Sequence, residues 1–193
     1  AYSMLELIAV IASILYIVLA ANNSRYCWPA AFISSVIFVA VMWNAGLLMD
    51  SALNFYYAIM AIVGWVIWNQ KQQSSNQYGN IVRWSLSIHA MAISATIVCT
   101  IISGALLSRY TNAAFPYLDS FTTWGSLLAT WMLAKKILEN WLYWIAFDSV
   151  AIYLYINKSL WFTTALFVLF IVMSVYAFFN WSKITRTPAP ATI

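Results

Sequence analysis

The dominant pattern along the chain is a series of seven long apolar runs separated by short polar or charged breaks. The runs cover residues 4–21, 27–45, 51–69, 84–107, 117–134, 140–156 and 160–181. A helix needs about 20 apolar residues to cross a bilayer, and these runs are of that order. Their apolar residues are continuous, whereas barrel strands alternate. The pattern therefore predicts an all-α polytopic membrane protein with seven transmembrane helices.

Composition excludes a water-soluble globule. The chain has 193 residues, of which 64% are hydrophobic and 7% charged, against about 45–50% and 25% in an ordinary soluble domain. Cys27 and Cys99 form no disulfide or metal framework, and we expect both to be buried apolar side chains. The lone histidine, His89, has no metal-ligating residue at ligand spacing. We therefore expect neither a metal nor a cofactor.

The chain contains an internal repeat. Sliding it along itself until Trp28 meets Trp141 also pairs, without a gap, Glu6 with Asp119, Ser13 with Ser126, Ala21 with Ala134, Asn44 with Asn157, Leu47 with Leu160, Met60 with Met173 and Trp68 with Trp181. Apolar resemblance alone would not match acids, tryptophans and asparagines. We predict a first three-helix repeat at 1–69, a linker loop and helix at 70–114, a second repeat at 115–182 and a flexible tail at 183–193. With one helix between them, the two copies are parallel, in a 3+1+3 arrangement.

The basic residues predict an orientation. If the first helix starts outside, the inner side receives seven of them and the outer side only Arg109 and Lys158. The positive-inside rule then places the N-terminus outside and the C-terminus in the cytoplasm, in the inner (cytoplasmic) membrane. The first run lacks the features of a signal peptide, so we expect none. Four tryptophans near helix ends are typical of interfacial anchors: Trp68, Trp84, Trp161 and Trp181.

Among the five acidic residues, Asp148 is the most informative. It lies half way along the sixth helix, where a carboxylate costs a few kcal/mol to bury, so such a residue is usually functional. The alternative is a structural partnership with a polar side chain on a neighbouring helix. Glu6 and Asp119 begin equivalent helices, where they either cap the helix or line the mouth of a path. We expect Asp50 to lie in a loop, in contact with solvent.

Helical spacing gathers aromatic and hydroxyl side chains around Asp148. Trp141, Trp144 and Asp148 share one helix face because they are three and four residues apart. Such a mixture suits a flat, partly polar, cationic organic solute. The alternative is that the hydroxyl residues and aromatics only pack the helices together. We expect a substrate-binding group made of Asp148, Trp144, Trp141, Ser126, Thr123, Thr122, Asp119, Asn54, Tyr57 and Trp43.

Two rival classes of function are open to test. A membrane enzyme could use Asp148 and Glu139 as acid and base, but they are more than two helical turns, or about 13 Å, apart along one helix, so we expect no enzyme. A purely structural membrane subunit would tolerate alanine at all of these polar positions. A retinal protein is disfavoured because Lys183 lies at the end of the last helix instead of inside it.

The segment at 115–148, with K-K-x-x-E-N-W-x-x-W at 135–144, resembles the Pnu family of vitamin transporters; G-W-V-I-W at 64–68 and Glu6 support the likeness. The resemblance implies a 3+1+3 fold related to the SWEET sugar transporters. It also implies facilitated diffusion by alternating access, without ion coupling, with phosphorylation trapping the vitamin inside the cell. The family's W-x-x-W-x-x-x-N/D motif, here Trp141, Trp144 and Asp148, contributes to the substrate site.

The resemblance also bears on the substrate. Members that carry nicotinamide riboside usually end the motif with Asn, whereas this chain has Asp148, and D-S-F-T-T at 119–123 looks more like the thiamine branch. Thiamine is therefore the expected substrate and nicotinamide riboside the alternative; both are aromatic cations. The expected partners are the vitamin, the lipid bilayer and, by resemblance, further copies in a homotrimer. No nucleic acid is expected.

Overall fold

The computed structural model describes residues 2–44, 48–74, 81–112, 114–157 and 161–186. Within them the chain forms seven helices, as predicted: α1 (Tyr2–Ala21), α2 (Cys27–Asn44), α3 (Leu48–Ser74), α4 (Leu86–Tyr110), α5 (Pro116–Ala134), α6 (Asn140–Asn157) and α7 (Trp161–Arg186). Three segments in these ranges are long and apolar enough to cross a membrane: Ser51–Gln70, Leu86–Tyr110 and Thr164–Thr185. Two shorter apolar segments are Leu7–Ala21 and Cys27–Val41.

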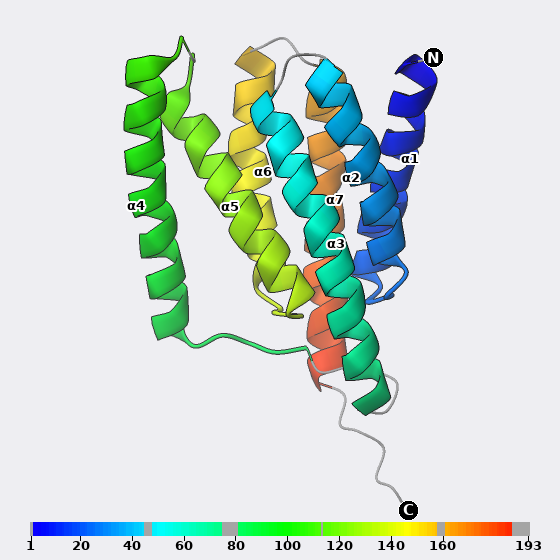
Figure 1. The fold of residues 1–193 in the computed structure, drawn as a ribbon. Coiled ribbons are helices and arrows are strands. Elements are labelled where there is room, and N and C mark those ends of the chain that lie inside the picture. The colour runs from blue at the N-terminus through cyan, green and yellow to red at the C-terminus, as the bar shows by residue number, and fades with distance from the viewer. Residues whose placement is uncertain (1, 45–47, 75–80, 113, 158–160, 187–193) are drawn as a thin grey trace, which may run out of the picture.

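Six of the helices pack into one bundle. α2 packs between α1 and α3, and α6 packs between α5 and α7. The two groups of three meet where α3 contacts α5 and where α1 contacts α7. α4 stands at the side of the bundle and packs against α5 (Figure 1). The helix pairs in contact thus form a closed circuit of six, with α4 outside it.

Two helices are longer than the apolar pattern predicts. α3 begins at Leu48, so Asp50 lies in its first turn and not in the expected loop. α7 continues to Arg186, so the first four residues of the expected tail, 183–186, are helical; residues 187–193 lie outside the described ranges. The apolar run marks the part of a helix that suits a membrane, whereas Gln, Lys and Arg have good helix propensity and let the helix continue beyond it.

The turns after α1 and α5 share an unusual backbone conformation. Asn23 has φ of 56° and Lys136 has φ of 59°. Asn tolerates this left-handed region, but a lysine seldom adopts it. Backbone hydrogen bonds hold the second turn, because the Val82 N–H donates to the Lys136 carbonyl oxygen (2.9 Å) and the Leu138 N–H donates to the Val82 carbonyl oxygen (2.8 Å).

The largest fully buried side chains are four tryptophans, Trp28, Trp68, Trp141 and Trp181, which we call the tryptophan cluster. Ring centroids lie 5.5 Å apart between Trp28 and Trp68, 6.0 Å between Trp68 and Trp181, and 5.4 Å between Trp141 and Trp181. The expectation that Trp68 and Trp181 are interfacial anchors is therefore wrong. They pack against other indoles and hydrogen-bond to neighbouring helices instead of facing a membrane surface.

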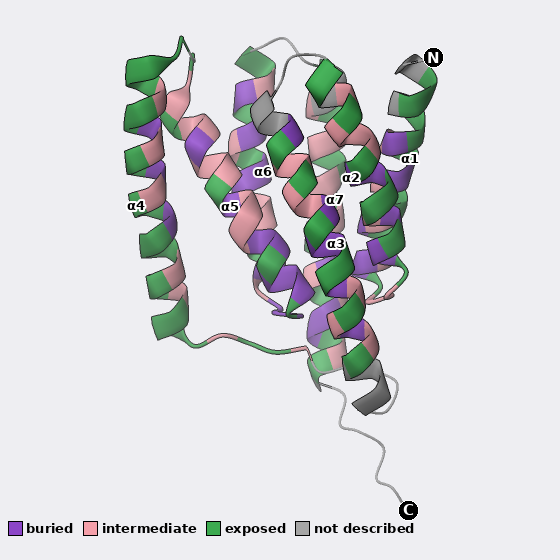
Figure 2. Ribbon diagram, viewed as in Figure 1, coloured by how far each residue is buried: buried purple, intermediate pink, exposed green. Residues whose placement is uncertain are grey.

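The main buried cluster draws on all six helices of the bundle, near the end where α1 and α5 finish. α4 is largely exposed (Figure 2). Cys27 is fully buried beside the tryptophan cluster, as expected, whereas Cys99 on α4 is only half-buried. The exposed face of α4 is apolar, as a helix surface in contact with lipid would be.

Candidate functional site

Asp148 lies in the middle of α6, and its side chain is 5% exposed. In the part of the chain that the structure describes, its carboxylate has no hydrogen-bond or ion-pair partner. Its electrostatic neighbours are the hydroxyl groups of Tyr16 on α1 and Tyr57 on α3. A carboxylate that is buried without a charge partner is expensive, so this position is the leading candidate for a site that binds a ligand.

The side chains around Asp148 come from both groups of three helices. Tyr57 on α3 forms a side-chain hydrogen bond with Ser126 on α5. The Tyr16 ring packs against Trp28, with ring centroids 6.4 Å apart. Four helices, α1, α3, α5 and α6, therefore supply this group, which sits where the two halves of the bundle meet.

A glycine sets the spacing between α5 and α6 at this level. A Cβ atom added to Gly125 would lie 2.3 Å from Cε1 of Phe147, so the aromatic ring packs directly on the α5 backbone. Phe147 precedes Asp148 in the chain, so α5 and α6 approach closely at the level of the carboxylate. Any larger residue at Gly125 would force the two helices apart.

The other predicted site residues are spread over a longer stretch of the bundle. Trp144 is half-buried and packs against the tryptophan cluster. Trp141 belongs to that cluster and lies about 10 Å along α6 from Asp148. Asn54 on α3 and Asp119 in the first turn of α5 are half-buried. Trp43, near the end of α2, is 65% exposed.

The two threonines of the predicted group use their hydroxyl protons within α5. Thr123 donates to the Asp119 carbonyl oxygen (2.8 Å), and Thr122 shares its donor between the carbonyl oxygens of Leu118 (3.1 Å) and Asp119 (3.0 Å). Only the lone pairs of these hydroxyls are left to accept from a ligand. The side chain of Glu6, a further predicted candidate, lies outside the described part of the chain.

Sequence reasoning missed Tyr16. A signal was present, because Tyr16 lies three residues after Ser13 and so shares its helix face. Ser13 faces the interior, where its hydroxyl is 2.6 Å from that of Ser34 on α2. A tyrosine on the inward face of the first helix could thus have been added to the candidates.

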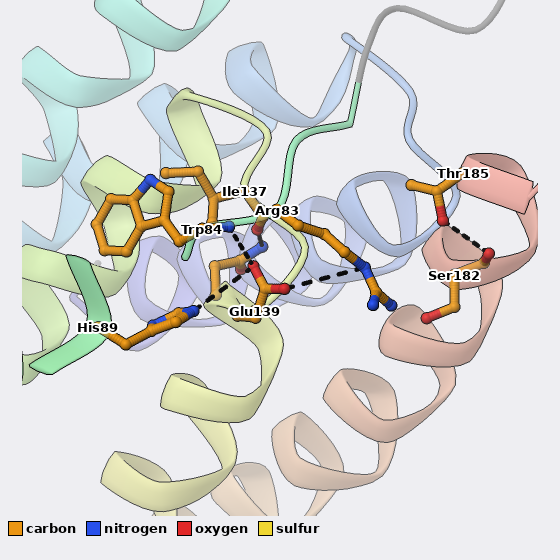
Figure 3. Close-up of polar contacts among 8 residues, drawn as sticks. Arg83, Trp84, His89, Ile137, Glu139, Ser182 and Thr185 are labelled. Atoms are coloured by element: carbon orange, nitrogen blue, oxygen red, sulfur yellow. Dashed lines mark hydrogen bonds and ion pairs between the residues drawn. The ribbon is translucent and has the colours of Figure 1, made fainter. Parts of the chain in front are cut away.

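Glu139 serves a structural purpose and is not an acid or base working with Asp148. Figure 3 shows its carboxylate between Arg83, Trp84 and His89. One oxygen accepts from the Trp84 backbone N–H (3.3 Å) and lies 4.0 Å from Nε2 of His89, and the other is 4.0 Å from Nε of Arg83 (Figure 3). These contacts tie the segment before α4 to the α5–α6 turn.

The comparisons with known proteins agree on a family. A family model described as "Nicotinamide mononucleotide transporter" matches residues 3–183. The chain is 25% identical to the nicotinamide riboside transporter PnuC of Haemophilus influenzae, covering 95% of this chain and 81% of that protein. It is 22% identical to the riboflavin/roseoflavin transporter RibM of Streptomyces davaonensis, covering 91% and 83%.

A solved structure shares the fold. The crystal structure of the vitamin B3 transporter PnuC matches with a TM-score of 0.77 and 21% identity, over 95% of this chain and 83% of that one. None of these relatives is named for thiamine, so the preference for thiamine gains no support from them, whereas the resemblance to the Pnu family is confirmed. The chain belongs to the nicotinamide mononucleotide transporter family and is a multi-pass membrane transporter of the PnuC type, not an enzyme.

Proposed function

We propose that this protein carries nicotinamide riboside across the inner membrane by facilitated diffusion with alternating access. The similarity to nicotinamide riboside transporters supports this substrate. The observation that carries the proposal is the buried Asp148 carboxylate at the meeting of the two halves of the bundle. A cationic nicotinamide ring beside it would return the favourable electrostatic energy that burial removes.

The aromatic side chains suit such a ligand. Tyr57 and Trp144 offer ring faces, which attract a cation by about 0.5–2 kcal/mol each. Ser126 and Thr123 offer hydroxyl groups to the polar edges of the ribose. In this proposal Asp148 provides the charge, the rings provide stacking and the hydroxyls set the orientation; Trp141, Thr122, Asp119, Asn54 and Trp43 extend the path on either side.

The charge distribution favours a nucleoside over a mononucleotide. All nine basic residues lie outside the middle of the seven apolar runs. A phosphate monoester would bring close to two negative charges toward Asp148 with no cation to pair with them. We expect the nucleoside to be carried and the mononucleotide to be rejected.

Alternating access follows from the proposed 3+1+3 arrangement of parallel repeats, in which one group of three helices rocks against the other. Several contacts support a two-fold relation. The only two described non-glycine residues with positive φ, Asn23 and Lys136, are 113 positions apart and bonded to each other. The repeat-related Trp68 and Trp181 are also in contact. We keep the N-terminus outside, the C-terminus in the cytoplasm and the homotrimer as parts of this proposal.

Calorimetric titration of the purified protein tests the substrate. We expect binding of nicotinamide riboside and none of nicotinamide mononucleotide, and we expect Asp148→Ala to weaken binding by about tenfold or more, as loss of a charged contact does. Ser35→Ala is the matched control, because Ser35 is the equivalent buried position on α2. Tight binding of the mononucleotide, or an Asp148→Ala protein that binds like the parent, would contradict the proposal.

Thiamine stays a second candidate because it too is an aromatic cation that Asp148 could attract. The same titration separates the two vitamins, since the preferred one will bind more tightly. Riboflavin, named for one relative, is uncharged in its ring system, and its binding should be less sensitive to Asp148→Asn than that of either cation. If the rate of uptake into liposomes does not change when a pH gradient is imposed, transport is not coupled to protons.

A further inference from the structure

One end of the bundle is closed by contacts between its two halves. At this end α1, α3, α5 and α7 finish and α2 and α6 begin (Figure 1). The tryptophan cluster packs with residues from the ends of these helices. The indole N–H of Trp68 on α3 donates to the Ala134 carbonyl oxygen at the end of α5 (3.1 Å). The indole N–H of Trp181 on α7 donates to the Ala20 carbonyl oxygen at the end of α1 (3.1 Å). Each half therefore donates an indole N–H hydrogen bond to a carbonyl oxygen at the end of a helix in the other half.

A buried lysine reinforces this closure. Lys136 is 4% exposed, and its ammonium group donates to Oδ1 of Asn23 in the opposite half (2.9 Å) and lies 4.2 Å from the centre of the Trp68 ring. In α7, Asn180 donates to the Ala21 carbonyl oxygen (3.0 Å), and the Tyr176 hydroxyl to Oδ1 of Asn22 (3.1 Å). A belt of hydrogen bonds thus joins the two halves at this end.

The other two indoles of the tryptophan cluster are not satisfied. The N–H groups of Trp28 and Trp141 are buried and find no acceptor in the described part of the chain. An unpaired buried donor opposes the state that buries it, whereas a paired donor favours that state. The closed cluster therefore combines two bonds that hold it with two N–H groups that would gain a partner if it opened.

We propose that the tryptophan cluster, together with the Lys136–Asn23 hydrogen bond, is a gate that must part before a substrate near Asp148 can leave by this end. This inference rests on the proposed transport function. Asp148 lies about 10 Å along α6 from Trp141, so the cluster stands between the carboxylate and this end of the bundle. Rocking of one half against the other would break the Trp68, Trp181 and Lys136 contacts together, because all three cross between the halves.

A matched pair of variants separates a gate from ordinary core packing. Trp181→Phe and Trp28→Phe remove the same volume from the cluster, but only Trp181 loses a hydrogen bond. If the cluster is only core packing, the two variants should open it equally often. If it is a gate, Trp181→Phe should raise the open fraction about three- to tenfold more than Trp28→Phe does. Asn23→Gly removes the hydrogen bond to Lys136 and keeps the left-handed backbone that Asn23 adopts, so it should open the gate in the same direction as Trp181→Phe.

Cys27 offers a native reporter, since it is fully buried beside the cluster. In a Cys99→Ser background it is the only thiol, and its rate of alkylation by N-ethylmaleimide measures opening. We expect Trp181→Phe and Asn23→Gly to raise this rate about three- to tenfold and Trp28→Phe to stay within about twofold of the parent. Equal rates in all three variants, each melting near the parent temperature, would overturn the gate.

The test also separates the gate from the proposed function. Alkylation is measured without substrate, so it reports opening even if nicotinamide riboside fails to bind. If nicotinamide riboside binds but its uptake into liposomes is unchanged in Trp181→Phe and Asn23→Gly, the cluster is not on the path of release. If the alkylation rates separate as expected and the vitamin does not bind, the substrate proposal fails while the opening motion stands.

Discussion

α2 and α6 hold equivalent places in the predicted repeat, yet they bury different polar side chains. Trp28 on α2 and Trp141 on α6 are both fully buried in the tryptophan cluster. Seven residues later, Ser35 on α2 and Asp148 on α6 are 6% and 5% exposed. One helix thus buries a hydroxyl where the other buries a carboxylate, to a similar degree.

Two buried serines of the first half, Ser34 on α2 and Ser51 on α3, form their hydrogen bonds within that half. The Ser34 hydroxyl donates to the Ala9 carbonyl oxygen on α1 (3.0 Å) and lies 2.6 Å from the Ser13 hydroxyl. Ser51 on α3 donates to the Val39 carbonyl oxygen on α2 (2.9 Å). These bonds fasten α1, α2 and α3 together, whereas the Asp148 carboxylate has no such bond in the described part of the chain and is proposed to bind the ligand. A repeated framework can therefore carry an asymmetric site through a single replaced side chain.

The largest effect is expected at Asp148 itself. Asp148→Ala should lower uptake of the preferred vitamin about tenfold or more, because a charge-assisted contact contributes about 1.5–3 kcal/mol. Ser35→Ala should leave uptake within about twofold. Radiolabelled uptake into proteoliposomes measures both, and equal losses at the two positions would remove the distinction between α2 and α6.

A second effect tests how closely the halves match in their packing. A Cβ atom on Gly64 of α3 would lie 2.3 Å from Cε2 of Trp28, whereas the repeat-related position on α7 is the buried Ala177. Gly64→Ala should destabilise the protein by about 1–3 kcal/mol through overpacking, visible as a lower melting temperature. Ala177→Gly is the control and should cost about 0.5–1 kcal/mol. A Gly64→Ala protein that melts like the parent would show that Trp28 can move freely.

A smaller effect is expected at Glu139, whose contacts hold α4 and the segment before it against the α5–α6 turn. The first half of the bundle has no counterpart to α4. Glu139→Gln removes the charge facing Arg83 and His89 but keeps an oxygen to accept from Trp84. We expect a loss of stability of about 0.5–1 kcal/mol, typical of half-exposed charge contacts, with uptake retained. Uptake that collapses while the melting temperature holds would assign Glu139 a role in transport.

The smallest effect is expected for Tyr57→Phe, which keeps the ring and loses the hydroxyl that bonds to Ser126. Binding of the vitamin should weaken about two- to fivefold, since a neutral hydrogen bond contributes about 0.5–1 kcal/mol. Titration calorimetry measures this directly. Ser126→Ala should weaken binding more, because its hydroxyl is also proposed to contact the ribose; an equally large loss in Tyr57→Phe would mean that the tyrosine hydroxyl touches the ligand as well.

The sequence predicted the helices well because a spanning helix is apolar both where it faces lipid and where it faces the bundle, so each helix gives a continuous apolar run. It also singled out Asp148, since a carboxylate in the middle of an apolar run is costly to bury and is seldom present without a function. It could not assign Trp68 and Trp181 to the tryptophan cluster, because a tryptophan near a helix end looks the same whether it faces a membrane surface or another indole. Nor could it reveal that Thr122 and Thr123 donate within α5, which depends on side-chain rotation.

The tryptophan cluster has an optical consequence. Four fully buried indoles, with neighbouring ring centroids 5.4–6.0 Å apart, exchange excitation energy and emit at shorter wavelengths than indoles in water. Parting of Trp68 and Trp181 would let water reach them and shift their emission to longer wavelengths. The opening of this end of the bundle should therefore be visible in the intrinsic fluorescence of the unlabelled protein, in real time, as a vitamin is added.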